Sequence, residues 1–157
     1  NIRRARRTAE EEDLHTEYVA DFSNHSWRRI FRRIIDVERR SWKGREDSGI
    51  ATGAMHDFYR RMVPMLAGDD ALRVSFVSVA GDDVAYCFGG LFDDLYRGLQ
   101  LSYDSDYKEY SAGNLAHIAM LEGLCREGVG TYDMGQAMDY KSRWAESEVT
   151  SVALVIR

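Results

Sequence analysis

The sequence has few of the features that mark secreted, zinc-binding or membrane proteins. It contains two cysteines, Cys87 and Cys125, without C-x-x-C spacing, which excludes a disulfide framework and a zinc site of that type. No apolar run approaches the roughly 18 residues that cross a bilayer, and the arginine-rich start lacks the apolar stretch of a signal peptide. We therefore expect a cytoplasmic protein without a membrane span, in which both cysteines are buried.

Metal and hydrolase chemistry have equally little support. The four histidines show no metal-ligand spacing such as H-E-x-x-H, and no nucleophile motif accompanies them. We therefore expect no metal cofactor and no Ser-His-Asp site.

The length and composition of the chain favour one folded domain over residues 1–157. With 157 residues, of which 45% are hydrophobic and 30% charged, the chain suffices for a single core. It starts at Asn1 rather than at a methionine, and arginines follow at once. We expect a piece of a longer protein, in which residues 1–12 form a helical lead-in from a missing N-terminal lobe.

The charge is unevenly distributed along the chain. The net charge is −5, yet residues 26–45 hold eight cations against Asp36 and Glu38. This basic segment is typical of a solvated helix face. The alternative is a surface that attracts a phosphate-bearing ligand such as RNA, a cofactor tail or a nucleotide-linked precursor.

Hydrophobic periodicity predicts an α+β fold with one mixed, mostly antiparallel sheet covered by helices. Pairs of aspartates after a glycine or between apolar runs mark the turns that separate the middle strands. The predicted strands are 15–20, 72–79, 84–92, 95–103, 131–134 and 149–156, and the predicted helices are 1–12, 26–42, 52–66 and 113–127, with a short helical or looped segment at 136–146.

The helix at 52–66 has an apolar side rich in methionine and aromatic residues. We expect this side to be core rather than a cofactor-binding surface. Its members are Met55, Phe58, Tyr59, Met62, Met65 and Leu66.

Three segments carry a resemblance to a known family. They are E-R-R-S-W-K-G-R at 38–45, S-Y-D-S-D-Y-K-E-Y-S-A-G-N-L at 102–115 and Y-D-M-G-Q-A-M-D-Y-K-S-R-W-A at 132–145. In this order, with the predicted elements between them, they resemble the GNAT superfamily of acetyltransferases, and within it the FemAB-related, CelD-like group. Members of that group typically have two such lobes, and this chain is similar to the C-terminal one.

The resemblance implies transfer of an acyl group from acetyl-CoA or another acyl-CoA to an amine, in cell-envelope or polysaccharide metabolism. The chain departs from the usual pyrophosphate motif Q/R-x-x-G-x-G/A, because Ser111, Ala112, Gly113 and Asn114 stand at the corresponding place. FemAB proteins themselves use aminoacyl-tRNA, so the acyl donor stays open between the two.

Residues before the helix at 113–127 form the candidate donor site. Free backbone N–H groups at a helix N-terminus bind phosphate, although the same residue types also form ordinary caps. The predicted cofactor-binding residues are Tyr103, Ser111, Ala112, Gly113, Asn114 and Lys141.

Three residues are the candidate catalytic groups. Asp104 ends a strand just before the loop and is the predicted general base, with a turn-forming role as the alternative. Asp133 is the alternative base, or it orients Lys141. Tyr140 lies where the resemblance implies an acid for the leaving group, and Trp144 is expected to be packed in the core beneath it.

The candidate acceptor-binding residues are Glu38, Trp42, Lys43, Arg45 and Gln136. A competing hypothesis is a binding or scaffold lobe that takes no part in chemistry. Its basic helix at 26–45 would then hold aminoacyl-tRNA or a nucleotide-linked sugar.

Overall fold

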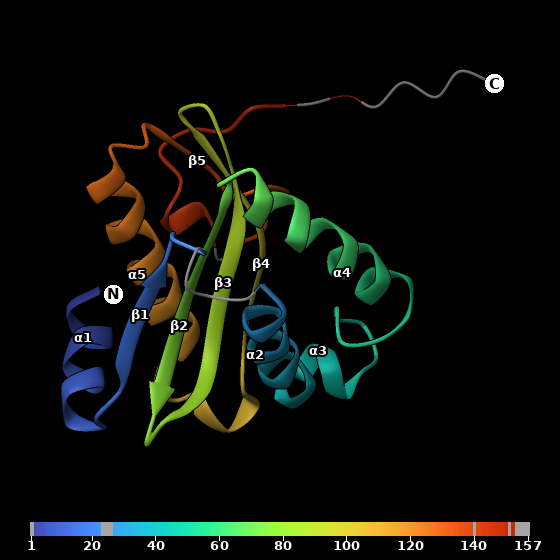
Figure 1. Ribbon diagram of the computed structural model, residues 1–157. Helices are drawn as coiled ribbons and strands as arrows, with labels where there is room; N and C mark the ends of the chain where they lie inside the picture. The colour runs from blue at the N-terminus through green and yellow to red at the C-terminus, as the bar shows by residue number, and fades with distance from the viewer. Residues whose placement is uncertain (1, 23–26, 140, 151, 153–157) are drawn as a thin grey trace.

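A mixed sheet forms the centre of the molecule. The computed structural model describes residues 2–22, 27–139, 141–150 and 152. Within them the five strands of the sheet follow the chain order, as Figure 1 shows: β1 (His15–Val19), β2 (Leu72–Val79), β3 (Asp82–Phe92), β4 (Leu95–Tyr103) and β5 (Thr131–Asp133). Neighbours from β1 to β4 pair antiparallel, and β5 pairs parallel with β4. The predicted α+β class with a mixed, mostly antiparallel sheet is confirmed.

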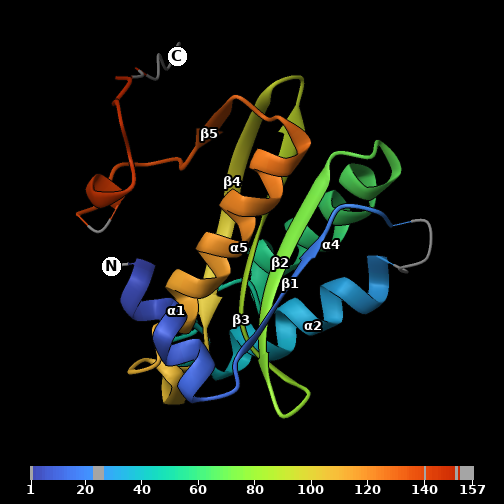
Figure 2. The same cartoon turned by 90° about the vertical axis from the view of Figure 1, so that its left-hand side faces the viewer.

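Helices cover both faces of this sheet (Figures 1 and 2). On one face lie α2 (Trp27–Arg40), α3 (Trp42–Arg45) and α4 (Gly53–Gly68). On the other lie α1 (Ile2–Glu11) and α5 (Ala112–Glu127). Two short 3-10 turns complete the described elements: η1 (Ser105–Tyr107) precedes α5, and η2 (Lys141–Arg143) follows β5. Residues 2–11 of the predicted helical lead-in form α1, which packs against α5.

Each face of the sheet has its own apolar core. On β3, Tyr86 and Phe88 pack with α2 and α4, whereas Ala85 and Cys87 pack with α5. Successive side chains of a strand point to opposite faces, so a strand covered on both sides has no solvent-facing positions. This is why the middle strands contain long apolar runs rather than a strict alternation.

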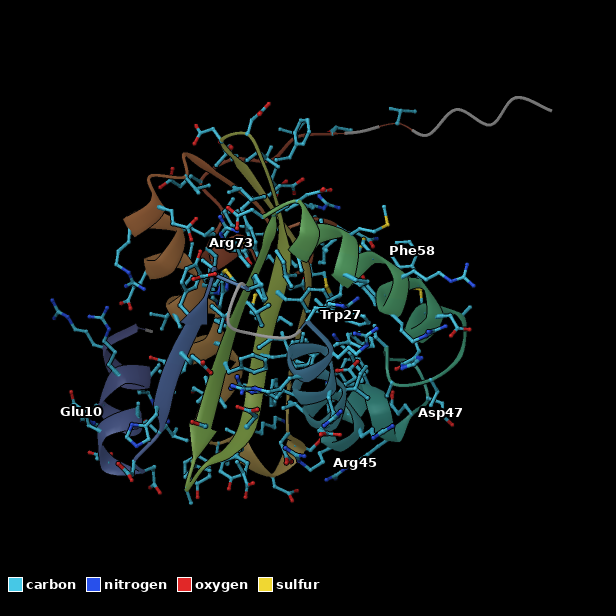
Figure 3. The ribbon with its side chains drawn as sticks, viewed as in Figure 1. Glu10, Trp27, Arg45, Asp47, Phe58 and Arg73 are labelled. Carbon is cyan, nitrogen blue, oxygen red and sulfur yellow. The ribbon has the colours of Figure 1, made fainter. Side chains whose placement is uncertain are left out.

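The apolar side of α4 is narrower than the sequence predicts. Tyr59 is buried and packs on Phe88, with ring centroids 5.5 Å apart. Phe58 and Met65, however, are 52% and 66% exposed. Each precedes an inward-facing residue by one position, which rotates it by about 100° around the helix. Figure 3 shows Phe58 on the outer side of α4. Met55, in the first turn, is also exposed, so the expectation that this whole side is core was wrong in part.

Two further expectations need correction. Cys87 is buried, but Cys125 is exposed, because it lies on the outer side of α5. Of the strand predicted at 149–156, residues 149, 150 and 152 are described and are not in a strand, and the others lie outside the described residues. In that described part of the chain, no helix is long and apolar enough to cross a membrane.

Candidate functional site

A cleft opens where β4 and β5 separate. Their parallel pairing ends at Arg97 and Asp133, where β5 itself ends, and a cavity of about 320 Å³ lies between β4 and the segment that follows β5. Residues from α3, β3, β4, α5, β5 and the segment after β5 line it: Lys43, Cys87, Arg97, Gly98, Leu99, Gln100, Leu101, His117, Tyr132, Met134, Gly135, Gln136, Met138 and Lys141. The cleft is therefore lined by side chains from both faces of the sheet.

A β-bulge explains why the strands part at this place. Phe88 pairs with Gln100 and Gly89 with Gly98, so Leu99 has no partner on β3. An extra residue in one strand bends it and increases its local twist. Gly98 adds room, since a Cβ on it would lie 2.9 Å from Cε2 of Tyr132. Among the described residues, β5 pairs with β4 only from Leu95 to Arg97, and further along β4 the Leu101 carbonyl accepts from Lys43 Nζ instead.

The N-terminus of α5 lies beside this cleft and is uncapped. Leu115 N–H donates to Ser111 O, but Ser111 makes no side-chain cap. No backbone or side-chain acceptor for the N–H groups of Ala112, Gly113 and Asn114 occurs within the part of the chain that the structure describes. Unpaired N–H groups together with the helix dipole form an anion-binding site.

Two residues give this N-terminus its shape. Gly113 lets the Tyr103 ring lie against the first turn, because a Cβ there would be 2.8 Å from Cδ1 of Tyr103 and 3.5 Å from Cδ2 of Leu101. Ser111 has φ +57°, in the left-handed region. Glycine adopts that conformation without strain, whereas a serine there is strained.

Lys43 reaches the cleft from the short helix α3. The Ser41 hydroxyl accepts a hydrogen bond from Gly44 N–H and thereby caps this helix at its start. Lys43 Nζ donates to Leu101 O at 2.9 Å and lies 3.5 Å from Gln100 Oε1. Burial lowers the pKa of Lys43, and the negative charge of Glu38 opposes that shift.

Glu38 does not reach the cleft, although the sequence suggested it for acceptor binding. It is completely buried beneath α3. Its Oε2 accepts a hydrogen bond from Tyr86 Oη at 2.9 Å, and its Oε1 accepts one from Ile50 N–H at 3.1 Å. Glu38 therefore fixes the loop between α3 and α4 and cannot contact an acceptor directly.

The opposite wall of the cleft contains a group that the sequence did not reveal. His117 on α5 is buried, and its Nε2 lacks a hydrogen-bond partner in the described part of the structure. Burial lowers the pKa of His117 to about 4, with a smaller contribution from the charge of Lys141. Its ring lies against Tyr132 and Trp144, at centroid distances of 5.3 and 4.5 Å. No spacing in the sequence distinguishes this histidine from an ordinary core residue.

The segment after β5 closes one side of the cleft. Asp133 pairs with Arg97 and accepts a hydrogen bond from Gly135 N–H at 2.7 Å. Although burial opposes it, these bonds and charges lower the pKa of Asp133. Lys141 Nζ donates to the carbonyls of Met134 and Gln136, at 2.7 and 2.8 Å. Lys141 and Gln136, two of the predicted site residues, line the cleft. Asp133 lies at its edge, where Arg97 binds its carboxylate.

Other predicted site residues lie elsewhere. Asp104 is buried beyond the end of β4, where its carboxylate accepts from Arg40 Nε at 2.6 Å and from Asp106 N–H at 3.1 Å. This engagement caps η1 and keeps Asp104 out of the cleft. Arg45 is exposed and lies 3.3 Å from Asp106 Oδ1, and Trp42 is exposed on α3. Tyr140 lies outside the described residues.

The basic segment is partly compensated by acidic neighbours. Arg33 pairs with Asp83 and Glu17, at 2.7 and 2.6 Å. Burial alone would lower the pKa of Arg33, but its hydrogen bonds to these carboxylates and their charges raise it. Arg40 pairs with Asp104, and Arg39 pairs with Asp36 at 3.3 Å. A surface hollow of about 510 Å³ beside α2 is lined by both signs of charge. The segment is therefore not a continuous cationic surface.

Several solved structures with this fold are acetyltransferases. An aminoglycoside acetyltransferase, meta-AAC0020 from an uncultured soil metagenomic sample, in complex with sisomicin, is 13% identical, with a TM-score of 0.62 over 95% of this chain and 99% of that chain. AAC(6')-Iy in complex with a bisubstrate analog, CoA-S-monomethyl-acetylneamine, is 7% identical, with a TM-score of 0.61 over 92% and 97%. PaiA N-acetyltransferase from Thermoplasma acidophilum, in complex with coenzyme A, is 12% identical, with a TM-score of 0.52 over 83% and 86%.

These likenesses establish the fold, and a family model adds the sequence evidence. No curated protein matches this chain significantly. The model described as "Acetyltransferase (GNAT) domain" matches residues 1–142, which include every strand of the sheet and the cleft between β4 and β5. The chain therefore belongs to the GNAT acetyltransferase domain family.

Proposed function

We propose that the protein is an N-acyltransferase that moves an acyl group from acyl-CoA, in the first instance acetyl-CoA, to a small-molecule amine. One observation carries this proposal: the cleft between β4 and β5 adjoins an uncapped helix N-terminus. A donor that combines a diphosphate with a long thioester arm suits such a pair of sites. Related folds in complex with coenzyme A and with a CoA bisubstrate analog support it.

The residues present fit such a donor. The N–H groups of Ala112, Gly113 and Asn114 would bind its diphosphate, and Tyr103 would flank it. The backbone of β4 from Gly98 to Gln100, which pairs with no described residue of β5, would hold the arm and donate to the carbonyl oxygen on which charge develops. When bound, acetyl-CoA supplies an acyl group already activated as a thioester.

Two proton movements accompany the transfer. The attacking amine loses a proton, and His117 lines the cleft with an imidazole that burial keeps unprotonated near neutral pH. We assign it the role of hydrogen-bond acceptor for the amine, which Asp104 does not fill because Arg40 binds it. The departing thiolate takes up a proton from a tyrosine, for which Tyr132 in the cleft and the predicted Tyr140 are the candidates.

The two tyrosines can be separated by substitution. Tyr132→Phe and Tyr140→Phe each remove one hydroxyl and retain the ring. The variant that lacks the proton donor should lose about 10²–10⁴-fold in kcat while its affinity for CoA is unchanged. If both variants keep full activity, neither tyrosine is the acid.

The first test of the proposed function is thermal unfolding with acetyl-CoA, longer acyl-CoAs and free CoA. A ligand at 100 times its Kd should stabilise the fold by about 2.7 kcal/mol. Gly113→Ala should abolish this shift, since its Cβ would lie 2.8 Å from Tyr103 at the proposed diphosphate site. Gly68→Ala, in open space at the end of α4, is the matched control and should keep the shift. No shift with any CoA in the unaltered protein would contradict the proposal.

Finer features of the proposal rest on the three sequence segments. They support the FemAB-related, CelD-like group, a C-terminal lobe and an acceptor from cell-envelope or polysaccharide metabolism. Aminoacyl-tRNA as donor would need a basic surface, and the pairing of Arg33, Arg39 and Arg40 with acidic residues weighs against one. Mass spectrometry of amines incubated with the protein and either donor separates the two.

A further inference from the structure

The cleft has an unbalanced charge. Three cationic side chains line it, Lys43, Arg97 and Lys141, and no carboxylate of the described residues is among its lining. Asp133 lies outside this lining and is paired with Arg97, and Glu38 is enclosed in the core behind Lys43. Burial lowers the pKa of Lys141, and the charges of Arg97 and Lys43 lower it further while that of Asp133 opposes them, so the cations of the cleft repel one another. An anionic ligand would relieve this repulsion.

We propose that the acceptor is an amine that also carries a carboxylate, and that Lys43 binds this carboxylate. The inference rests on the proposed function and deepens it, because it names the class of acceptor for the same cleft. The carboxylate would meet the ammonium group of Lys43 while the amine faces the β4 edge of the cleft.

The position of Lys43 separates it from the phosphates of the donor. Lys43 comes from α3, on the sheet face that α2 and α4 cover, whereas α5 and its N-terminus lie on the opposite face (Figures 1 and 2). The arm of acyl-CoA between diphosphate and thioester carries no charge. A half-buried ammonium group bound to Leu101 on the β4 edge therefore serves a ligand other than that arm.

At least one N–H donor of the Lys43 ammonium group has no acceptor among the described residues. An ammonium group has three N–H donors, and Leu101 O and Gln100 Oε1 accept from at most two of them. A charge-assisted hydrogen bond to a carboxylate is about twice as strong as a neutral one. The site thus holds one N–H group in place before the acceptor arrives.

The same charge disfavours acceptors with several amines. Solved structures similar to this chain include aminoglycoside acetyltransferases, one of them in complex with sisomicin. A polyamine sugar brings several positive charges, and the three cations of this cleft would repel it. We therefore expect the acceptor of this protein to differ in charge from an aminoglycoside.

Matched acceptors that differ in one group test the proposal. Glycine, alanine and glutamate are compared with their α-amides, each with acetyl-CoA, and release of CoA and acetylated product are both measured. The acid should have at least a 10-fold higher kcat/KM than its amide. Phosphoethanolamine compared with ethanolamine shows whether a phosphate replaces the carboxylate, and kanamycin represents a polycation.

Variants then assign the effect to Lys43. Lys43→Met should reduce kcat/KM for the acid to the level of the amide, whereas Lys43→Arg should retain the preference. Arg61→Met removes one positive charge from an exposed position on α4 outside the cleft, and it should leave the preference unchanged. The thermal shift with CoA should persist in all three, which shows that each is folded and binds the donor.

Several results would overturn the inference. An acid and its amide that react equally, a preference for kanamycin, or a preference that survives in Lys43→Met would each contradict it while leaving acyl transfer intact. Transfer to phosphoethanolamine alone would replace the carboxylate by a phosphate and contradict the acceptor class stated here. A CoA shift without transfer to any amine would contradict the proposed function as well.

Discussion

Two residues beside the cleft are held in states that are unfavourable in isolation. Ser111 has left-handed backbone angles without making a side-chain cap. His117 is buried with Nε2 unpaired among the described residues. Such states persist when the surrounding packing enforces them, and they are more frequent at functional sites than elsewhere. Both lead to predictions that are independent of any substrate.

Replacement of Ser111 by glycine should stabilise the protein. Glycine relieves the cost of φ +57°, which we expect to raise the free energy of unfolding by about 1 kcal/mol and the Tm by roughly 2–4 °C. Ser111→Ala retains the strain and should show no such gain. Thermal unfolding of both variants checks this, and a Ser111→Gly variant less stable than the unaltered protein would contradict it.

His117 should make stability depend on pH. Its pKa falls from the ordinary 6.5 to about 4 on folding, so the unfolded state binds more protons between these values. Stability therefore decreases as the pH falls from about 7 to 4, by about 3 kcal/mol from this group. Urea denaturation should show that His117→Leu lacks this part of the dependence. His15→Gln, at an exposed histidine, is the control and should retain it.

At the level of elements, α5 is the helix that joins the cleft to the rest of the fold. It packs on β1, β2 and β3 and supplies both the uncapped N-terminus and His117. Its approach to β1 depends on Gly123, where a Cβ would lie 2.3 Å from Cδ2 and Cε2 of Tyr18. Tyr18 Oη in turn donates to Glu127 Oε1 at 2.5 Å, so its ring cannot move away freely.

Two glycine-to-alanine substitutions in helices should therefore change the free energy of unfolding in opposite directions. Gly123→Ala should lower the free energy of unfolding by about 1–2 kcal/mol, since overpacking outweighs the gain in helix propensity. At Gly68 no atom lies within 4 Å of the new Cβ, so Gly68→Ala should raise the free energy of unfolding by up to about 1 kcal/mol. Urea titrations measure the free energy of unfolding of both variants. If Gly123→Ala is also stabilising, α5 and β1 move apart without cost and the prediction is wrong.

At the scale of the whole molecule, the two thiols differ in whether the folded protein exposes them to water. Cys125 is exposed on α5, whereas Cys87 lies inside the sheet and burial raises its pKa to about 11. Only unfolding or a large opening of the core brings Cys87 into water.

A thiol reagent should thus modify one cysteine quickly and the other slowly. In Cys125→Ser, we expect the remaining reaction to follow the population of the unfolded state and to accelerate steeply with urea. Acetyl-CoA should slow it further, because Cys87 lines the cleft and a ligand stabilises the fold. Fast modification of Cys87 in the absence of denaturant would mean that the cleft opens locally.

Much of the fold could be predicted from the sequence, because helix and strand periodicity are local properties. The strands β2 and β4 lie at the predicted residues, and α5 begins one residue earlier than predicted. The candidate site was predicted less fully. Lys43, Gln136 and Lys141 line the cleft, whereas Asp104 is bound by Arg40 and Glu38 is buried under α3.

The sequence by itself determined the alternation and periodicity that produce a mixed sheet between two layers of helices. The tertiary structure alone decided that Lys43 and His117, 74 positions apart in the sequence, line the same cleft. The physical reason is that the cleft depends on the register of β3 and β4, on the unpaired Leu99 and on the end of β5 pairing at Asp133. These are relations between distant segments, and no local pattern of side chains encodes them.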